Sequence, residues 1–363
     1  MSAADFFRAV IFGSCSEART DGVKANRSAN IPRLALAFLA IAALLPAACA
    51  QHTAGSPRLE ILSSEWQLSG FENSLDLSGI AAASKTHCLV GSDEMFYVQP
   101  GVIDVAKQRI ESKRPVALPV KSKGKKQEVD VEGVAYSPED RAYYVVGSHG
   151  LGKKKGDFQQ DRHSIYQVPV DPATGQVKKD GIRRASLLPW LEKTPEVKPY
   201  LKKPLQQNGF NIEGLTWSGG KLWFGLRAPN QNGRGIVLDL APDQLFEGGK
   251  PAPLSVHEIV IAKGFGIREI AAVRDGFIVL TGNASAEASK KFPVTAAPGP
   301  DTRFELLHWN GRDSKATNLG RLPENGGKGE ALLVLDDTAD HVDLLVIFDG
   351  LPGGEPMNVR IPR

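Results

Sequence analysis

Glutamate recurs along the chain in a short phrase, where glycine or an apolar residue follows it. The copies place Glu132, Glu213, Glu269 and Glu330 at equivalent positions, 81, 56 and 61 residues apart, and Ser78 takes this position 54 residues before Glu132. Carboxylate and amide oxygens are the ligands that Ca²⁺ and Mg²⁺ prefer. The sequence therefore predicts a divalent-cation site whose candidate ligands are Glu132, Glu213, Glu269, Glu330 and Asp76.

The same carboxylates have a structural alternative. Like charges gathered near one axis repel strongly in a partly desolvated place, so something must offset them. Instead of binding a metal, each glutamate could accept backbone N–H groups of a neighbouring sheet or pair with Arg227, Arg268 or Lys328. The sequence leaves both explanations open.

A second apolar run follows each glutamate phrase and ends in polar residues. His149 and Arg227 end two of these runs, so we expect His149 as a general base and Arg227 as the group that orients an anion. A hydrogen-bonded loop role is the alternative for His149. Three consecutive lysines, Lys153, Lys154 and Lys155, are candidates for binding an anion, or else form a solvated face.

The elements that would position these side chains are short strands. The spacing of the phrases is the period of a β-propeller blade, and each unit contains about four apolar runs of strand length. We predict an all-β, five-bladed β-propeller. A six-bladed ring is the alternative if the 81-residue interval holds two units, but residues 182–205 are rich in Lys, Leu and Pro and predict an insertion with a short helix at Leu187–Leu191.

The last unit contains only three strand-like runs before the chain ends. Residues 58–64 have no other place, so we expect them to supply the missing strand and to close the ring, which leaves no long unpaired edge. In the first unit we expect the fourth strand at Val116–Val120, and residues 101–126 as a loop insertion.

The N-terminus is typical of a secretory signal. Residues 34–45 form an apolar run that is too short to span a bilayer, and the small residues around Cys49 suit cleavage before Gln51. Lipid attachment at Cys49 is the alternative. We therefore expect a signal region at 1–50, a linker at 51–57 and one propeller domain at 58–363. Within the signal region we expect translation to start downstream of residues 1–22.

Several expectations about context follow from that signal. The protein should be periplasmic or secreted, and the processed chain should have no transmembrane span. We also expect a monomer. An exported location argues against nucleic acid as a partner, and an anionic small molecule or envelope glycan is the candidate ligand. Processing leaves Cys88 alone, so no intramolecular disulfide can form.

Two of the phrases resemble a known family. Asp130–Ala135 with Val146–His149, and Asn211–Leu215 with Gly225–Arg227, resemble the bacterial domain-of-unknown-function family number 3616, over about residues 74–349. The glutamate phrases alone are loosely similar to calcium-dependent lactonase-like and phytase-like propellers. That similarity implies that such a glutamate can bind a channel metal, although Ser78 departs from the pattern and no full ligand set can be matched.

Three functions remain open at this stage. One is a metal-assisted hydrolase of a phosphoester, ester or lactone, with Ca²⁺ or Mg²⁺ as cofactor. The second is a non-catalytic envelope propeller that binds an anionic ligand or a protein, and the third is a structural scaffold. The chain lacks the motifs of serine hydrolases, zinc proteases and nucleoside triphosphatases, which argues against those classes.

Overall fold

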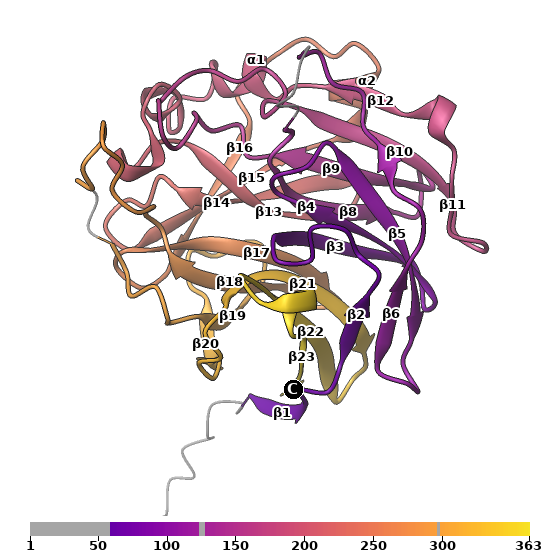
Figure 1. Cartoon of the computed structure of the whole chain (residues 1–363). Coiled ribbons are helices and arrows are strands. Elements are labelled where there is room, and N and C mark those ends of the chain that lie inside the picture. Colours follow the sequence, from indigo (N-terminus) through magenta and orange to yellow (C-terminus); the bar gives the residue numbers. More distant parts are fainter. Residues whose placement is uncertain (1–58, 123–127, 296–297) are drawn as a thin grey trace, which may run out of the picture. The chain divides into compact units, whose positions relative to one another are not determined.

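A computed structural model describes residues 59–122, 128–295 and 298–363. These residues form five sheets in sequence order, and each sheet is built mainly from antiparallel neighbours (Figure 1). Together they form a five-bladed β-propeller, as the repeat spacing predicts. The six-bladed alternative is wrong, because the long interval adds helices and a short strand to blade two rather than a further sheet.

Blades one and two each carry an outer edge made of more than one short strand. The strands of blade one are β3 (Leu77–Ser84), β4 (His87–Ser92), β5 (Tyr97–Asp104), β6 (Arg109–Ser112), β2 (Gln67–Ser69) and β7 (Val116–Ala117). The strands of blade two are β8 (Val131–Ser137), β9 (Ala142–Gly147), β10 (Ile165–Asp171), β11 (Gln176–Val177) and β12 (Arg183–Ala185).

Blades three to five each have four strands. Blade three contains β13 (Asn211–Ser218), β14 (Lys221–Ala228), β15 (Arg234–Leu240) and β16 (Ser255–Val260). Blade four contains β17 (Phe265–Val273), β18 (Gly276–Asn283), β19 (Glu305–Trp309) and β20 (Thr317–Arg321). Blade five contains β21 (Lys328–Asp337), β22 (His341–Asp349), β23 (Met357–Pro362) and β1 (Glu60–Ser63).

The helices are short and lie in the connections. They are α1 (Leu188–Leu191), α2 (Pro242–Phe246) and the 3₁₀ turns η1 (Lys179–Gly181), η2 (Lys198–Tyr200), η3 (Leu205–Gln207) and η4 (Pro352–Gly354). Residues 182–205 hold β12, α1 and η2, and their buried side chains Leu187, Leu191 and Val197 join the core between blades two and three. This segment thus packs against the blades that it connects.

Local sequence explains the hairpins that aim the inner strands. Ser218 pairs with Lys221 across a two-residue turn in which Gly219 and Gly220 both have positive φ, of 58° and 76°. Only such a turn matches the right-handed twist of the two strands, and glycine adopts it without strain. This turn reverses the chain between β13 and β14, and thereby returns Arg227 to the end of the blade at which Glu213 lies.

The glycine that follows the glutamate allows the inner strands to approach one another closely. A Cβ atom on Gly133 would lie 2.7 Å from Cβ of Leu215, and one on Gly214 would lie 2.9 Å from the backbone nitrogen of Ile270. These contacts join consecutive blades around the channel. The Glu-Gly phrase therefore marks the place where a side chain at this position would force the blades apart.

The terminal strand closes the ring as predicted. β1 pairs antiparallel with β23, which completes the order β1-β23-β22-β21 (Figure 1). One prediction for blade one is wrong. Residues 101–112 are not a loop insertion, because Gly101 lies within β5 and β6 (Arg109–Ser112) pairs with β5 as a β-hairpin. Residues 105–108 form the turn of this hairpin, in which the Gln108 N–H donates to the Val105 carbonyl at 3.2 Å. The strand expected at Val116–Val120 is present in part as β7, which also pairs with β5.

The expectations for residues 1–50 and for the linker at 51–57 lie outside the described residues. Within the part of the chain that the structure describes, no helix has the length and apolar character needed to cross a membrane.

Trp309 is fully buried and stacks on Phe277 with ring centroids 5.2 Å apart, and its ring meets that of Trp223 edge-on. These aromatic residues fill the space between blades three and four.

Candidate functional site

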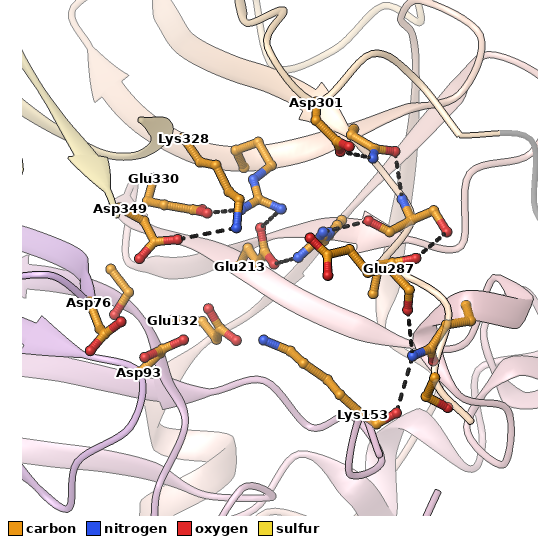
Figure 2. A pocket seen from close by; sticks show the side chains of 18 of the residues that line it. Asp76, Asp93, Glu132, Lys153, Glu213, Glu287, Asp301, Lys328, Glu330 and Asp349 are labelled. Carbon is orange, nitrogen blue, oxygen red and sulfur yellow. Dashed lines mark hydrogen bonds and ion pairs between the residues drawn. The ribbon is translucent and has the colours of Figure 1, made fainter. Parts of the chain in front are cut away.

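A cavity of about 690 Å³ opens at the end of the channel where the inner strands begin (Figure 2). Inner strands supply Ser78, Glu132 and Glu213 near their first residues, and second strands supply Arg227 and Asp349 at or near their last. Strand order alone brings these starts and ends to one face. The ionisable lining side chains are Asp76, Asp93, Glu132, Lys153, Lys154, Glu213, Arg227, Arg268, Glu287, Lys290, Asp301, Lys328, Glu330 and Asp349.

One side of the cavity is a chain of ion pairs that joins three blades. Glu213 receives Arg227 Nη1 at 2.7 Å on one carboxylate oxygen and Arg268 Nη1 at 2.8 Å on the other. Arg268 also pairs with Glu330 of blade five. Burial and the nearby charge of Arg227 lower the pKa of Arg268 to about 10, so the guanidinium stays charged at neutral pH. We call these four residues the paired side.

Glu269 is a structural contact between blades. Its Oε1 atom accepts the backbone N–H of Leu215 at 2.9 Å and that of Ile270 at 2.8 Å. Burial raises the pKa of Glu269, while the two N–H groups act in the opposite direction. Ser78, which stands where the other units have glutamate, donates instead to the carbonyl oxygen of Val131 in the next blade.

The predicted set of metal ligands does not converge on one point. Glu213 and Glu330 are bound to arginine, and Glu269 is bound to backbone and does not line the cavity. Among the described residues, no group of three or more His, Cys, Asp or Glu side chains is arranged to hold a metal ion. The five predicted ligands therefore do not fit a shared divalent cation.

The opposite side of the cavity contains Asp76, Asp93 and Glu132, and we call it the unpaired side. In the described part of the chain none of the three takes part in a salt bridge, and Oδ1 of Asp93 is buried without a hydrogen-bond partner. Glu132 is buried and only 6% exposed. Figure 2 shows all three directed into the open space.

Burial changes the acidity of these three carboxyl groups. Burial and the charge of Asp130 raise the pKa of Asp93 to about 8. The same two causes raise the pKa of Glu132 well above its ordinary value, and Glu213 adds to them. Burial also raises the pKa of Asp76, against a hydrogen bond from Asn73 that lowers it. The unpaired side therefore retains protons at a pH where ordinary carboxyl groups have lost them.

Of the three predicted anion-binding lysines, Lys153 and Lys154 line the cavity and Lys155 does not. The amine of Lys153 is directed at Glu132 (Figure 2). Burial alone lowers the pKa of Lys153, but the charges of Asp130 and Glu132 outweigh it and raise the pKa. Lys154 is exposed at the rim.

His149 is a buried residue whose ring is hydrogen-bonded to the backbone on both sides. The residue is 1% exposed and does not line the cavity. With the Nδ1 proton on the ring, Nδ1 donates to the Gly147 carbonyl at 2.9 Å and Nε2 accepts the Leu187 N–H at 3.2 Å. Burial lowers the pKa of His149 to about 3. Both nitrogens are occupied, so the role of general base does not suit this residue.

Arg227 lies in the cavity wall, as expected, but both of its terminal nitrogens are engaged. Nη1 pairs with Glu213, and Nη2 donates to the Ser285 carbonyl at 2.6 Å. Arg227 thus anchors Ser285, which lies in the connection between β18 and β19. This double contact leaves the guanidinium little freedom to orient a ligand.

Sequence reasoning gave Asp93 no chemical role and named Arg268 only as a possible partner of the glutamates, and it did not select Gln206 or the β18–β19 loop. Asp93 offered a signal, since it follows β4 as His149 follows β9 at the end of a second strand. Gln206 offered none. It is 1% exposed, and its Nε2 atom donates at 3.1 Å to the carbonyls of both Lys153 and Glu287.

The fold and this cavity define the class of the protein: a five-bladed propeller with a polar pocket at one mouth of its channel. The chain belongs to the family described as "Protein of unknown function (DUF3616)", whose profile matches residues 76–168 and 171–355. The predicted family is thereby confirmed. A search of curated proteins gave no match.

Solved structures with related architecture include two carbohydrate-active enzymes. A GH43 β-1,3-galactosidase aligns at 12% identity and a TM-score of 0.45, over 85% of this chain and 59% of that one. An exo-β-1,3-galactanase from Phanerochaete chrysosporium aligns at 9% identity and 0.45, over 84% and 64%. A nidogen/laminin complex aligns at 10% identity and 0.34, over 76% and 77%. At such scores the likeness carries no argument about activity.

Proposed function

We propose that the cavity is the active site of a hydrolase that uses carboxyl groups as its acid and base. The observation that carries this proposal is the unpaired side. Asp76, Asp93 and Glu132 point into a cavity with no salt-bridge partner among the described residues, whereas Glu213 and Glu330 in the same wall are tied to arginine. Unpaired buried carboxyls destabilise a fold, so their presence favours a chemical role.

The environments of the carboxyl groups supply both halves of acid–base catalysis. Asp93, with a pKa of about 8, keeps its proton at neutral pH and would protonate a leaving group. Burial raises the pKa of Asp76 too, while Asn73 and the nearby lysines oppose the rise; Asp76 is only half-buried, and in its ionised form it would serve as the base that activates water. A pair of carboxyls with these two roles suits hydrolysis of a glycosidic or ester bond.

The charge of the cavity limits the substrate. Eight carboxyl side chains and six cationic ones line it, and both arginines among them, Arg227 and Arg268, are bound to glutamate. Neither arginine is therefore free to bind a phosphate. A cavity of about 690 Å³ accommodates a small ligand. We infer a neutral, hydroxyl-rich substrate, such as a glycoside, a neutral ester or a lactone, in preference to a phosphoester.

A substrate panel tests this proposal. Purified protein should hydrolyse a neutral chromogenic glycoside, ester or lactone with no added metal. Asp93→Asn should lower kcat by roughly 100-fold or more, because the general acid is lost. Glu258→Gln, on outer strand β16, is the matched control and should keep full activity. Turnover that is unchanged in Asp93→Asn, or no turnover of any neutral substrate, contradicts the proposal.

A second candidate is a non-catalytic propeller that captures an anionic ligand at the rim. Exposed Lys154 and Lys290 favour it, because they stand in the cavity wall without a salt bridge to any described residue. Binding of an anionic glycan that weakens steeply with salt, and is lost in Lys154→Gln, supports this candidate. An exported, monomeric protein with its signal at residues 1–50 is part of both proposals.

A further inference from the structure

Lys153 is the one residue of the predicted lysine cluster whose ammonium group enters the cavity between the acidic side chains. Figure 2 shows its amine directed at Glu132, with Asp93 and Asp76 beyond. Its charge acts on each of these three carboxyls, and in each case it lowers the pKa. The lysine therefore offsets the repulsion that burial of the unpaired side creates.

The backbone that carries Lys153 is fastened from two sides. The Lys153 carbonyl accepts Nε2 of the buried Gln206 at 3.1 Å, and the same Nε2 holds the Glu287 carbonyl in the β18–β19 loop. Gly152 and Gly156 close a turn around the lysine, with Gly156 N–H donating to the Gly152 carbonyl at 2.8 Å. A flexible surface lysine would not be anchored in this way, so its position near Glu132 is built into the fold.

We propose that the ammonium group of Lys153 is the built-in cation of this cavity, and that it takes the place among Asp76, Asp93 and Glu132 that a divalent metal would otherwise fill. The need for a cation follows from the charges, as the sequence implied. Its source is the chain itself, because the carboxylates that would complete a metal shell are bound to arginine or backbone. The inference goes beyond the proposed hydrolysis, because it concerns how the charge of the cavity is neutralised. Its tests measure metal binding and stability, not turnover.

The wild-type protein gives the first test, which needs no variant. Calorimetric titration with CaCl₂ and with MgCl₂ should show no saturable binding, and neither a chelator nor about 10 mM CaCl₂ should move the melting temperature. Saturable Ca²⁺ or Mg²⁺ binding, or a melting temperature that falls in chelator, would overturn the proposal. In that case a metal, and not the lysine, neutralises the site.

A double-mutant cycle gives the second test. Lys153→Met should lower the melting temperature by roughly 3 °C or more, because it leaves Glu132 without its cation. Adding Glu132→Gln to Lys153→Met should restore most of that loss, and Lys153→Arg should stay close to wild type. The matched control, Lys154→Met at the exposed rim, should change the melting temperature by less than about 1 °C.

Two outcomes of the cycle contradict the proposal. If Lys153→Met and Glu132→Gln have additive effects, the two groups are not coupled. If Lys153→Met and Lys154→Met lower the melting temperature equally, the cavity position of Lys153 has no special role. Should Lys153→Met not fold, Lys153→Gln and the wild-type metal titration decide between the lysine and a metal.

Discussion

The two sides of the cavity treat the same kind of residue in opposite ways. Glu213 and Glu330 share Arg268 between three blades, and each of them has a guanidinium partner. Glu132 is buried and Asp93 half-buried in the same wall, and neither has such a partner among the described residues. The difference teaches that the repeated glutamate position has two settings: Glu213 and Glu330 hold blades together through arginine, and Glu132 lies in the cavity wall without an arginine partner.

The largest effect should come from removing the centre of the paired side. Arg268→Met leaves Glu330 with uncompensated buried charge and removes one of the two arginine partners of Glu213, so the free energy of unfolding should fall by about 3–5 kcal/mol. Chemical denaturation at neutral pH measures this loss. Arg234→Met, which breaks the exposed pair with Glu258, is the control and should cost less than about 1 kcal/mol. Equal losses in the two variants would show that the ion pairs of the paired side stabilise the protein no more than an exposed salt bridge does.

A pH-dependent effect is expected on the unpaired side. The pKa of Asp93 is about 8 in the folded protein against an ordinary 3.8, so the folded state binds the proton more tightly than the unfolded state. This contribution to stability is fully present below pH 3.8 and is lost as the pH rises to about 8. Asp93→Asn should remove the dependence.

The measurement is the unfolding free energy of both proteins across this pH range. The advantage of Asp93→Asn over the wild type should grow by about 2 kcal/mol toward the upper end, which is less than the full shift implies because neighbouring groups and water relax around the charge. The advantage should level off above pH 8. A difference that is constant with pH would mean that Asp93 is ionised in the folded state like an exposed carboxyl.

The smallest effect should come from Glu132→Gln, and it should have the opposite sign to that of Arg268→Met. Glutamine keeps the shape and removes a charge that burial disfavours, while Asp130 and Asp93 still offset the charge of Lys153, so the unfolding free energy at neutral pH should rise by about 1 kcal/mol or stay unchanged. Thermal unfolding in parallel with Arg268→Met checks this. A loss comparable to that of Arg268→Met would show that Glu132 stabilises the fold as Glu213 and Glu330 do, and the distinction between the paired and the unpaired side would be wrong.

Much of the fold was predictable from the sequence because a propeller repeats. The interval between glutamate phrases counted five blades, and the missing strand of the last unit implied closure by residues 58–64, which β1 fulfils. The outer edge of blade one was not predicted. Outer strands such as β6 face solvent and carry polar residues, so their composition differs little from that of a loop.

The site was predictable in place but not in partnership. Strand order determines that Glu132, Glu213, Glu330, Asp76 and Arg227 meet at one mouth, and all five line the cavity. It does not determine which charges touch. Arg268 belongs to the inner strand of blade four and reaches Glu213 and Glu330 on both neighbouring blades, a contact across the ring that no local pattern encodes.

By itself, then, the sequence determined the period, the number of blades, the ring closure and the gathering of carboxylates at one mouth, because these follow from local alternation and from the regular order of strands. Only the tertiary structure decided which carboxylates are neutralised and by what. Burial and distances between blades set those pairings: Glu269 accepts backbone N–H groups, Glu213 binds arginine, and Glu132 faces Lys153. A Glu-Gly phrase is the same in each case, and its surroundings give it a different role.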